Sequence, residues 1–529
     1  MSTAERKLNP ETLTTRYQKL CQLASKNGFD LDQVNRAHNK FVVKRKLVHF
    51  LVFLLLFGIS FSVHFWRLSE PNKVVFDEVH FGKFVSWYMT GEYFFDIHPP
   101  LAKLVQSSVA KMCNFKPDVN AFSHIGGAYP KDVNYMCLRV QSAFLSSLIG
   151  PTFYLLFVNF GLSLPIAIVS SFFFIFENSI LIESRMLVTD GFLFFFISLT
   201  IIFNLKLSKC KPFTKGWLLW MAITAVSLSC SVSTKFTALG TYAAVGISQI
   251  VQLISHYKSN SYKKNYKNDL LRSELFLLFL DTLIRGIIFL GSTALIFLIS
   301  FAFHFELLTY NGSGDAFMTK KFLTGLIPKD SNQIPNIQLN FFQRFWELLR
   351  TMHSSNMGLD ATHHYSSKWY HWPLHIGTPV RPFYPAKKST RLYYLINSES
   401  TVQKKVIPVV LRSYHKVDYF VNVIEHYTQP LSFAVSGYFF SLLPFFLVPR
   451  CTWIYHYIPP LIFAIIGFAF SFDILMRVFV SKKSKKLIIC FLLFMAAIYN
   501  WIIYMPWVYS LPITNEQFKK LFFFSSWKI

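Results

Sequence analysis

Ten long apolar segments constrain this chain more than any other feature, because a helix needs ~20 apolar residues to cross the hydrocarbon core of a membrane. With 53% hydrophobic residues and 59 Phe, the 529-residue chain has too many separate apolar runs for a soluble domain or a single anchor. The sequence therefore predicts an all-α polytopic membrane protein. The segments lie near residues 48–66, 138–159, 163–177 (a short one), 186–205, 216–232, 237–255, 274–303, 431–449, 453–478 and 486–507.

The formal net charge of +26 comes from basic residues beside the apolar segments, and these residues do not form one patch with interleaved aromatics. Such a pattern is typical of juxtamembrane charge that sets orientation, and it does not indicate a nucleic-acid partner. Basic runs within residues 40–46, 205–216 and 256–272 all fall on one side of the membrane if the N-terminus is cytosolic. We therefore expect the loop 67–137, between the first two spans, to face the lumen.

The basic run Ser481–Lys486 indicates one crossing more than the ten visible segments supply. Ten spans would place this run in the lumen, against the positive-inside tendency. The additional crossing is expected between Arg391 and Tyr427, where only broken apolar stretches occur and a discontinuous or protein-buried helix is needed. The expected architecture is then about eleven transmembrane helices with short helices in the lumenal loops.

The first lumenal loop contains the segment Val74–Leu104, VVFDEVHFGKFVSWYMTGEYFFDIHPPLAKL. A helix that starts near Phe76 places Asp77, Phe81, Phe84 and Tyr88 on one face, which suggests a helix lying on the membrane surface with an aromatic face down. From the pattern alone, Asp77 and its neighbour Glu78 are more simply solvated loop acids, or an acid pair that favours the helix dipole.

The motifs FDEVHFGKF and FFDIHPPLAK resemble the first lumenal loop of the protein O-mannosyltransferases, which move mannose from dolichyl phosphate mannose to Ser or Thr. The resemblance continues in one order through Glu177–Asp190, Asn311–Thr319, Asn340–Pro373 and Pro444–Pro460. It implies a C-type glycosyltransferase-like fold with eleven spans, a multi-pass location in the endoplasmic reticulum membrane, and a lumenal C-terminus. It also implies Ser/Thr-containing acceptor proteins and a homo- or heterodimer with a family member.

The resemblance implies that Asp77 and Glu78 are the catalytic acids. Transfer from a phosphate donor to a hydroxyl needs a base at the acceptor oxygen and a cation near the departing phosphate. It needs no general acid, because phosphate leaves as an anion that charge and hydrogen bonds can hold. We expect Asp77 to be the base and Glu78 to place the acceptor peptide, and the resemblance favours an inverting displacement without a covalent intermediate.

Four further residues are expected to bind substrate. His98 matches the family's His-Pro-Pro motif and is a candidate for the acceptor or sugar site, although a lone His is more often structural. Arg139 matches an arginine of the family's second span and is expected near the donor phosphate. Arg185 and Asp190, at the head of the fourth apolar segment, either pair to orient helices or bind a ligand.

Arg450, His456 and His363 are second-rank candidates for the same site. Interfacial anchoring by the aromatic residues of segment 453–457 is the competing explanation for the first two. No HExxH, DxD or paired CxxC motif occurs, and the adjacent His363 and His364 cannot face one ion from a regular element. We therefore expect no metal and no cofactor, and the lack of a Walker or GxGxxG loop argues against a nucleotide-sugar donor.

Two features of the lumenal loops stay open at the level of sequence. Cys113 and Cys137 share the first loop, where an oxidising compartment permits a disulfide, but two free thiols are equally compatible with the sequence. Asn311 begins the chain's N-x-S/T sequon and is either a glycosylation acceptor or part of a structural turn.

The chain departs from the family pattern in two places. Most members carry a β-trefoil of three MIR repeats where this chain has only Lys320–Leu339, and the family's GNP-type sequence is replaced by Ile396-Asn397-Ser398. The expected organisation is a cytosolic segment 1–47, an N-terminal membrane domain 48–303, a lumenal region 304–430 that lacks the MIR domain but contains one poorly marked span, and C-terminal spans in 431–529.

Three other functions are compatible with parts of this pattern. A catalytically silent subunit paired with an active relative is disfavoured by the presence of both Asp77 and Glu78. A mannosyltransferase that acts on a lipid-linked oligosaccharide would use the same donor and remains open. A transporter is the weakest alternative, because the acids lie in a loop and no internal repeat is evident.

Overall fold

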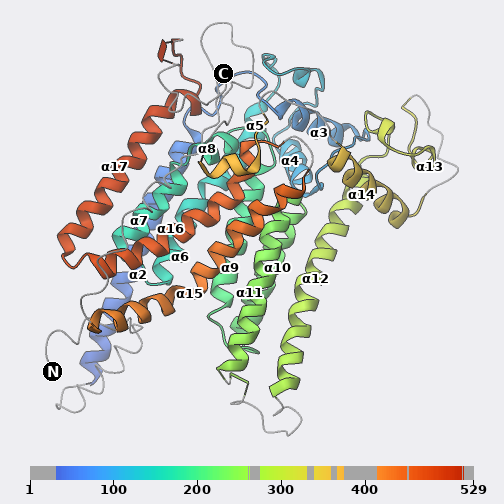
Figure 1. The fold of residues 1–529 in the computed structure, drawn as a ribbon. Helices are drawn as coiled ribbons and strands as arrows, with labels where there is room; N and C mark the ends of the chain where they lie inside the picture. The colour runs from blue at the N-terminus through green and yellow to red at the C-terminus, as the bar shows by residue number, and fades with distance from the viewer. Residues whose placement is uncertain are drawn as a thin grey trace.

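The structure is a computed structural model that describes residues 31–259, 261–262, 274–329, 339–358, 366–374, 414–448, 452–514 and 516–517. These residues form a bundle of long helices with shorter helices gathered at one end (Figure 1). Within the described ranges the β-structure is limited to three isolated bridges. The expectation of an all-α membrane fold is confirmed.

Each predicted apolar segment overlaps a helix or a pair of helices of the described residues. Nine helices of the described residues are long and apolar enough to span a membrane. A further pair, bent by 50°, makes ten if it forms one broken span and not a re-entrant loop. The spanning helices are α2 (Leu31–Phe65), α5 (Tyr135–Ser147) with α6 (Ile149–Asn159), the bent pair α7 (Leu164–Ile175) and α8 (Asn178–Ser184), α9 (Asp190–Leu207), α10 (Lys215–Val232), α11 (Leu239–Lys258), α12 (Glu274–Leu307), α15 (Tyr414–Leu442), α16 (Ile458–Phe479) and α17 (Lys483–Val508).

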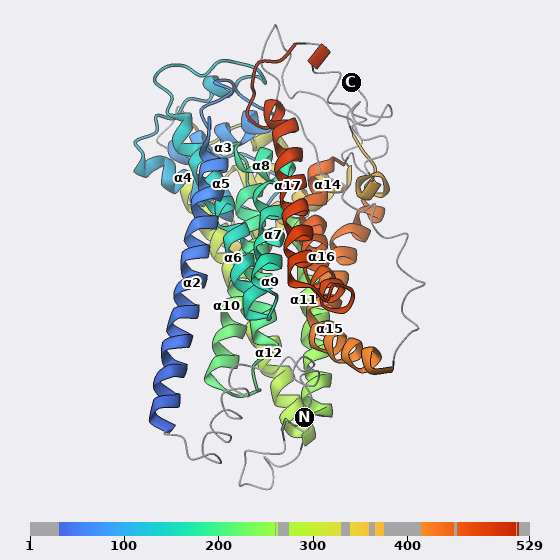
Figure 2. The ribbon, with the colours of Figure 1, turned by 90° about the vertical axis from the view of Figure 1, so that its left-hand side faces the viewer.

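Short helices and 3-10 turns gather at one end of the bundle, which we call the loop end (Figures 1 and 2). Local sequence explains their limits. Gly91 ends the first of them in a left-handed conformation with φ of 80°, and Pro100 opens the second. They are α3 (Glu78–Thr90), α4 (Leu101–Met112), α13 (Lys320–Leu323), α14 (Phe341–Gly358), η2 (Asn120–Phe122), η3 (Phe236–Ala238), η5 (Asp315–Phe317), η6 (Trp369–Leu374), η9 (Leu443–Leu447) and η10 (Ile454–Tyr457).

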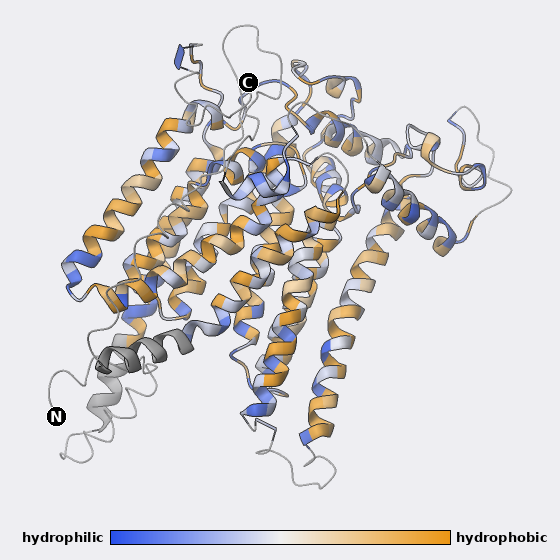
Figure 3. Ribbon diagram, in the orientation of Figure 1, coloured by the Kyte–Doolittle hydropathy of each residue, from blue (hydrophilic) through white to orange (hydrophobic). Residues whose placement is uncertain are grey.

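At the opposite end, hydrophilic residues lie at the tips of the long helices (Figure 3). We call it the basic end, because Lys206, Lys258 and Lys483 lie at helix ends there. The first described contacts of α15 are there, because Tyr427 donates to Asp473 near the end of α16, and Ser208, just after α9, donates to Gln429. η6 lies at the loop end, where Ser367 just before it bonds Thr452. η6 and the first described contacts of α15 therefore lie at opposite ends of the bundle. Most of the location expected for the additional crossing, 391–427, lies outside the described residues.

The aromatic face predicted for α3 is buried, and it is covered by protein and not by the membrane surface. Phe81, Phe84 and Tyr88 are at most 8% exposed. The Phe84 ring stacks on Phe94 at 4.6 Å between centroids, and the Tyr88 hydroxyl lies 2.6 Å from Nδ1 of His304 in α12. The expectation that this face rests on the membrane surface was wrong, because the following loop and α12 take that place.

Both open questions about the lumenal loops have a structural answer. Cys113 and Cys137 form a disulfide that ties the end of α4 to the first turn of α5. The Asn311 side chain donates to Asp315 at 2.8 Å, and a Cβ on Gly314 would lie within 2.6 Å of the Phe94 backbone. The Asn311–Asp315 segment is thus a turn packed tightly against the first loop, which favours the structural reading of the sequon.

Labelling of introduced cysteines tests the orientation of the two ends. With the chain's unpaired cysteines replaced, a cysteine at the exposed Ser313 should react only with reagent on the lumenal side. A cysteine at the exposed Lys483 should react only from the cytosol, and so should one at Lys264, which lies outside the described residues. Tyr457 is buried, so the label for this part of the chain is better placed at the exposed Phe446. Labelling of a cysteine at position 446 from the cytosol would contradict the additional crossing.

Candidate functional site

Asp77 is the N-cap residue of α3 and is half-buried. The preceding Phe76 adopts a left-handed backbone with φ of 48°, which is strained for a bulky residue and is a feature that clusters at functional sites. Its ring lies 6.1 Å from Trp453 and 5.8 Å from Tyr455 in edge contacts. The segment 453–457 therefore lies level with Asp77, as expected from the predicted topology.

Glu78 is fully buried and accepts hydrogen bonds from four groups around it. Its carboxylate takes a bidentate pair from Arg139, with Nε at 2.7 Å and the second contact at 2.8 Å. The Tyr129 hydroxyl and the backbone N–H groups of Val75 and Leu187 donate at 2.8–2.9 Å. Burial and the Glu78 carboxylate raise the pKa of Tyr129 well above its usual value, so its hydroxyl keeps the proton that it donates.

Arg139 is 1% exposed, and its guanidinium is satisfied entirely within the protein. Besides Glu78, it donates to the carbonyl oxygens of Leu68, Pro71 and Lys73 at 3.0–3.3 Å. Because Asp77 directly precedes Glu78, this ion pair fixes the position of Asp77 against α5. We call the Glu78–Arg139 pair the clamp.

The clamp differs from the roles expected for both residues. Glu78 was expected to place the acceptor peptide, but it has no exposed surface with which to meet one. Arg139 was expected near the donor phosphate, but its donors are directed to Glu78 and to backbone carbonyls. A buried charge is stable only when it is paired and hydrogen-bonded, and the two residues meet that need for each other.

Arg185 and Asp190 do not pair with each other, so that alternative was wrong. Arg185 donates to the carbonyl oxygens of His64, Trp66 and Arg67 at 2.6–3.0 Å, and thereby closes the C-terminal end of α2. Asp190, at the start of α9, binds the Lys235 ammonium through both oxygens, at 3.0 and 2.9 Å.

Lys235 joins the parts of the site that lie far apart in the sequence. Its ammonium lies 4.9 Å from the ring centroid of Tyr455, the residue that also contacts Phe76. The backbone N–H of Leu101 donates to the carbonyl of Ser233 at 3.1 Å, which brings the His-Pro-Pro turn next to this lysine. Sequence reasoning missed Lys235, although a charge at the end of an apolar span is a signal that could have found it.

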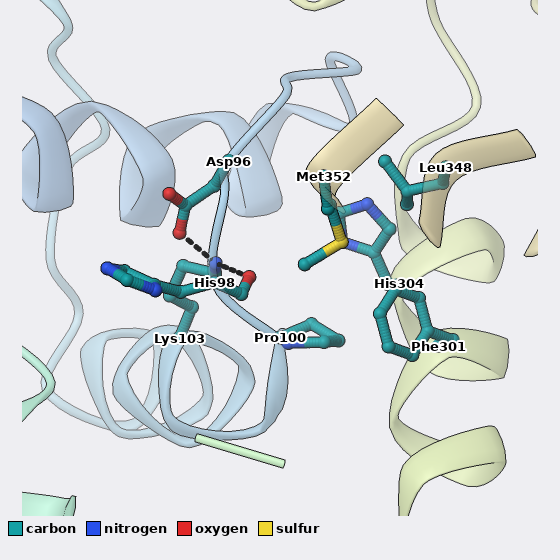
Figure 4. Close-up of a pocket in the computed structure, with 8 residues that line it drawn as sticks. All are labelled: Asp96, His98, Pro100, Lys103, Phe301, His304, Leu348 and Met352. Carbon is teal, nitrogen blue, oxygen red and sulfur yellow. Dashed lines mark hydrogen bonds and ion pairs between the residues drawn. The ribbon is translucent and has the colours of Figure 1, made fainter. Parts of the chain in front are cut away.

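The His-Pro-Pro turn is held by a buried ion pair between Lys103 and Asp96. Lys103 also donates to the His98 carbonyl oxygen at 2.7 Å, and Figure 4 shows its ammonium between these two partners. A small hollow beside this pair is lined by Asp96, His98, Pro100 and Lys103 on one side, and by Phe301 and His304 of α12 with Leu348 and Met352 of α14 on the other (Figure 4).

His456 is 3% exposed and belongs to the packing of the loop end. Its Nδ1 lies 2.9 Å from the Trp453 carbonyl oxygen, and its ring stacks on Trp372 at 6.2 Å. It therefore supports the segment that contacts Phe76. Arg450 and His363 lie outside the described residues. Among the residues that the structure describes, no group of three or more His, Cys, Asp or Glu is placed to hold a metal ion.

The bundle and the half-buried acid at its loop end define a polytopic membrane protein with a candidate site at one end. Two family models match the chain. "Dolichyl-phosphate-mannose-protein mannosyltransferase" matches residues 54–309, and "C-terminal four TMM region of protein-O-mannosyltransferase" matches residues 341–527. Together they cover more than half of the sequence. The chain belongs to the dolichyl-phosphate-mannose–protein mannosyltransferase family.

Curated relatives support this assignment. Mannosyltransferase 4 of Schizosaccharomyces pombe is 37% identical over 275 residues, which cover 51% of this chain and 34% of that relative. Mannosyltransferase 1 of Candida albicans is 36% identical over 299 residues, which cover 56% of this chain and 32% of that relative. The matched part of this chain thus spans about a third of the length of these relatives.

The fold also has a solved counterpart. The chain is similar to a structure of the Saccharomyces cerevisiae protein O-mannosyltransferase Pmt1-Pmt2 complex bound to the sugar donor, with a TM-score of 0.77 and 19% sequence identity. The similarity covers 91% of this chain and 93% of that chain. It confirms the predicted fold class.

Proposed function

We propose that this protein transfers mannose from dolichyl phosphate mannose to Ser or Thr hydroxyls of secretory-pathway proteins, at the lumenal face of the endoplasmic reticulum membrane. The observation that carries the proposal is the position of Asp77. Its half-exposed carboxylate is fixed by the clamp and lies beside Phe76, whose ring contacts Tyr455. The ring of Tyr455 in turn contacts the ammonium of Lys235. The proposed base and the cation are thus connected through the neighbouring rings of Phe76 and Tyr455.

In this reaction the acceptor oxygen attacks C1 of mannose while Asp77 takes the hydroxyl proton. The new bond joins the acceptor oxygen to C1, and the bond between C1 and the phosphate oxygen breaks. The electron pair leaves on the phosphate, which needs no proton because it is a stable anion. One displacement inverts the configuration at C1, so the product linkage has the configuration opposite to that of the donor.

We assign the contact with the departing phosphate to Lys235 in place of Arg139. Lys235 is also buried, at 3% exposed, but Asp190 takes two hydrogen bonds from an ammonium that has three N–H donors. This lysine follows α10 at the loop end, where the phosphate of a membrane-embedded lipid would lie. Asp190 orients its ammonium through two hydrogen bonds. His98, Arg450 and His363 remain candidates for contacts with sugar, peptide or phosphate.

The proposed partners are the lipid donor, Ser/Thr-containing acceptor proteins and a second family member. The solved relative is described as a Pmt1-Pmt2 complex, which supports a dimer for this chain as well. No cofactor is required by the proposed chemistry. The basic end is proposed to face the cytosol, because Lys and Arg gather in cytosolic loops.

The transfer assay that tests this function uses membranes containing the chain, labelled dolichyl phosphate mannose and a Ser/Thr-rich peptide. We expect label on a peptide hydroxyl, with an inverted linkage. Label on a lipid-linked oligosaccharide without label on the peptide would instead support the alternative acceptor.

Replacing Lys235 with Met should weaken binding of dolichyl phosphate about tenfold or more, because a charge-assisted contact to the phosphate is lost. Binding of radiolabelled dolichyl phosphate to purified protein measures the effect. The control is Lys320→Met, which removes an exposed lysine at the same end and should leave binding unchanged. Unchanged affinity in Lys235→Met would remove this lysine from the phosphate site.

A further inference from the structure

Glu183 is a buried acid that has no role in the Glu78–Arg139 clamp or in the proton transfer proposed for Asp77. It lies in α8, is 1% exposed, and its Oε1 atom has no hydrogen-bond partner among the residues that the structure describes. Buried polar atoms are nearly always hydrogen-bonded, because leaving one unpaired costs free energy. An unpaired carboxyl oxygen at this depth therefore points to a ligand.

The surroundings of Glu183 are the proposed site itself. The charged groups that act on its carboxyl are Asp190, Lys235 and Asp77. Asp190 already has both oxygens bonded to Lys235. Glu183 is thus within electrostatic range of the proposed base and the proposed phosphate contact, and its Oε1 atom can still accept a hydrogen bond.

The charge of this cluster limits the kind of ligand that Glu183 can take. The charges that act on Glu183 are two carboxylates, Asp77 and Asp190, and one ammonium, Lys235, so a further anion at Glu183 would be repelled. The described carboxyls are not grouped to hold a metal ion. A neutral ligand with several hydroxyl groups fits, because each O–H donates to a carboxylate oxygen without adding charge.

We propose that Glu183 binds hydroxyl groups of the mannose on the lipid donor and so selects a donor that carries the sugar. The inference rests on the proposed function and names the sugar subsite within it. In this arrangement Lys235 contacts the phosphate, Glu183 contacts the sugar, and Asp77 faces the attacking hydroxyl. The ratio of affinities for mannosylated and bare lipid phosphate then depends on Glu183.

The test measures the affinity of the purified full-length protein for dolichyl phosphate mannose and for dolichyl phosphate. Glu183→Leu removes both acceptor oxygens, and Glu183→Gln keeps the size and one acceptor. We expect Glu183→Leu to bind the mannosylated lipid about tenfold more weakly or worse, whereas its affinity for the bare lipid stays within about twofold. Glu183→Gln should fall between wild type and Glu183→Leu. Glu306→Gln, at an exposed acid near the end of α12, is the matched control.

A purely structural role for Glu183 predicts different results. If Glu183 serves the ligand and not the fold, replacing this buried acid with an apolar residue of similar volume should leave the melting temperature of the ligand-free protein unchanged or raise it. A lower melting temperature with equal losses for both lipids would overturn the proposal. An unchanged ratio of the affinities for mannosylated and bare lipid in Glu183→Leu would also overturn the proposal. If wild type itself fails to bind the mannosylated lipid, the proposed function fails, which is a separate result.

Discussion

Replacing Asp77 with Asn should lower turnover by ~10²-fold or more, as is typical for loss of a general base. The amide keeps the size of the carboxylate and cannot accept the acceptor proton. Binding of the lipid donor should stay nearly unchanged, because Asp77 acts in the transition state. Initial rates at saturating donor and peptide, together with donor affinity, measure the two effects separately.

The control for this variant is Asp132→Asn, which neutralises an exposed acid in the same loop and should transfer mannose at the wild-type rate. Near-normal turnover in Asp77→Asn would rule out the proposed mechanism. A loss of donor affinity equal to the loss of turnover would place Asp77 in the donor site, and its role as the acceptor base would then be untenable.

Breaking the clamp should destabilise the protein more than any other single change proposed above. Arg139→Met leaves the Glu78 carboxylate buried without its bidentate partner, and Glu78→Met leaves the guanidinium without its carboxylate. Removal of one partner of a buried ion pair typically costs about 3–5 kcal/mol. Thermal unfolding of the purified protein should show this loss for either variant, and activity should fall because Asp77 is no longer held.

The double variant Glu78→Met/Arg139→Met distinguishes the loss of the ion pair from the cost of leaving one buried charge unpaired. It should lose less stability than the sum of the two single losses, because neither charge is left unpaired. The comparison is Lys329→Met, which breaks the largely exposed pair with Glu92 and should cost about 1 kcal/mol or less. Additive losses in the double variant would contradict the coupling of Glu78 and Arg139.

Much of the fold follows from local sequence. The ten apolar segments predict their helices, because hydropathy over a span-length window needs no knowledge of distant residues. The ends of α3 and α4 follow from Gly91 and Pro100 in the same way. The charge of Ser481–Lys486 predicts one more crossing before α15, and this stays a prediction because most of its expected location lies outside the described residues.

The candidate site was predicted only in outline, because its pairings join residues that are distant in the sequence. Motif resemblance located Asp77 and Glu78, but the local sequence does not show that Asp77 is half-buried and Glu78 fully buried. The partner of Glu78 is 61 residues away, and Lys235 is 45 residues from Asp190. The sequence left Arg185 and Asp190 either to pair with each other or to bind a ligand, and the fold instead uses Arg185 to close α2.

The central claim is that this chain catalyses mannosyl transfer with its own Asp77. The most direct measurement supplies the chain with a family partner whose own catalytic acids have been neutralised, and follows transfer of labelled mannose to a Ser/Thr-rich peptide. We predict that wild-type chain supports transfer and that Asp77→Asn abolishes most of it. Transfer that requires intact acids in the partner, and that is unaffected by Asp77→Asn, would contradict the claim and identify the chain as a catalytically silent subunit.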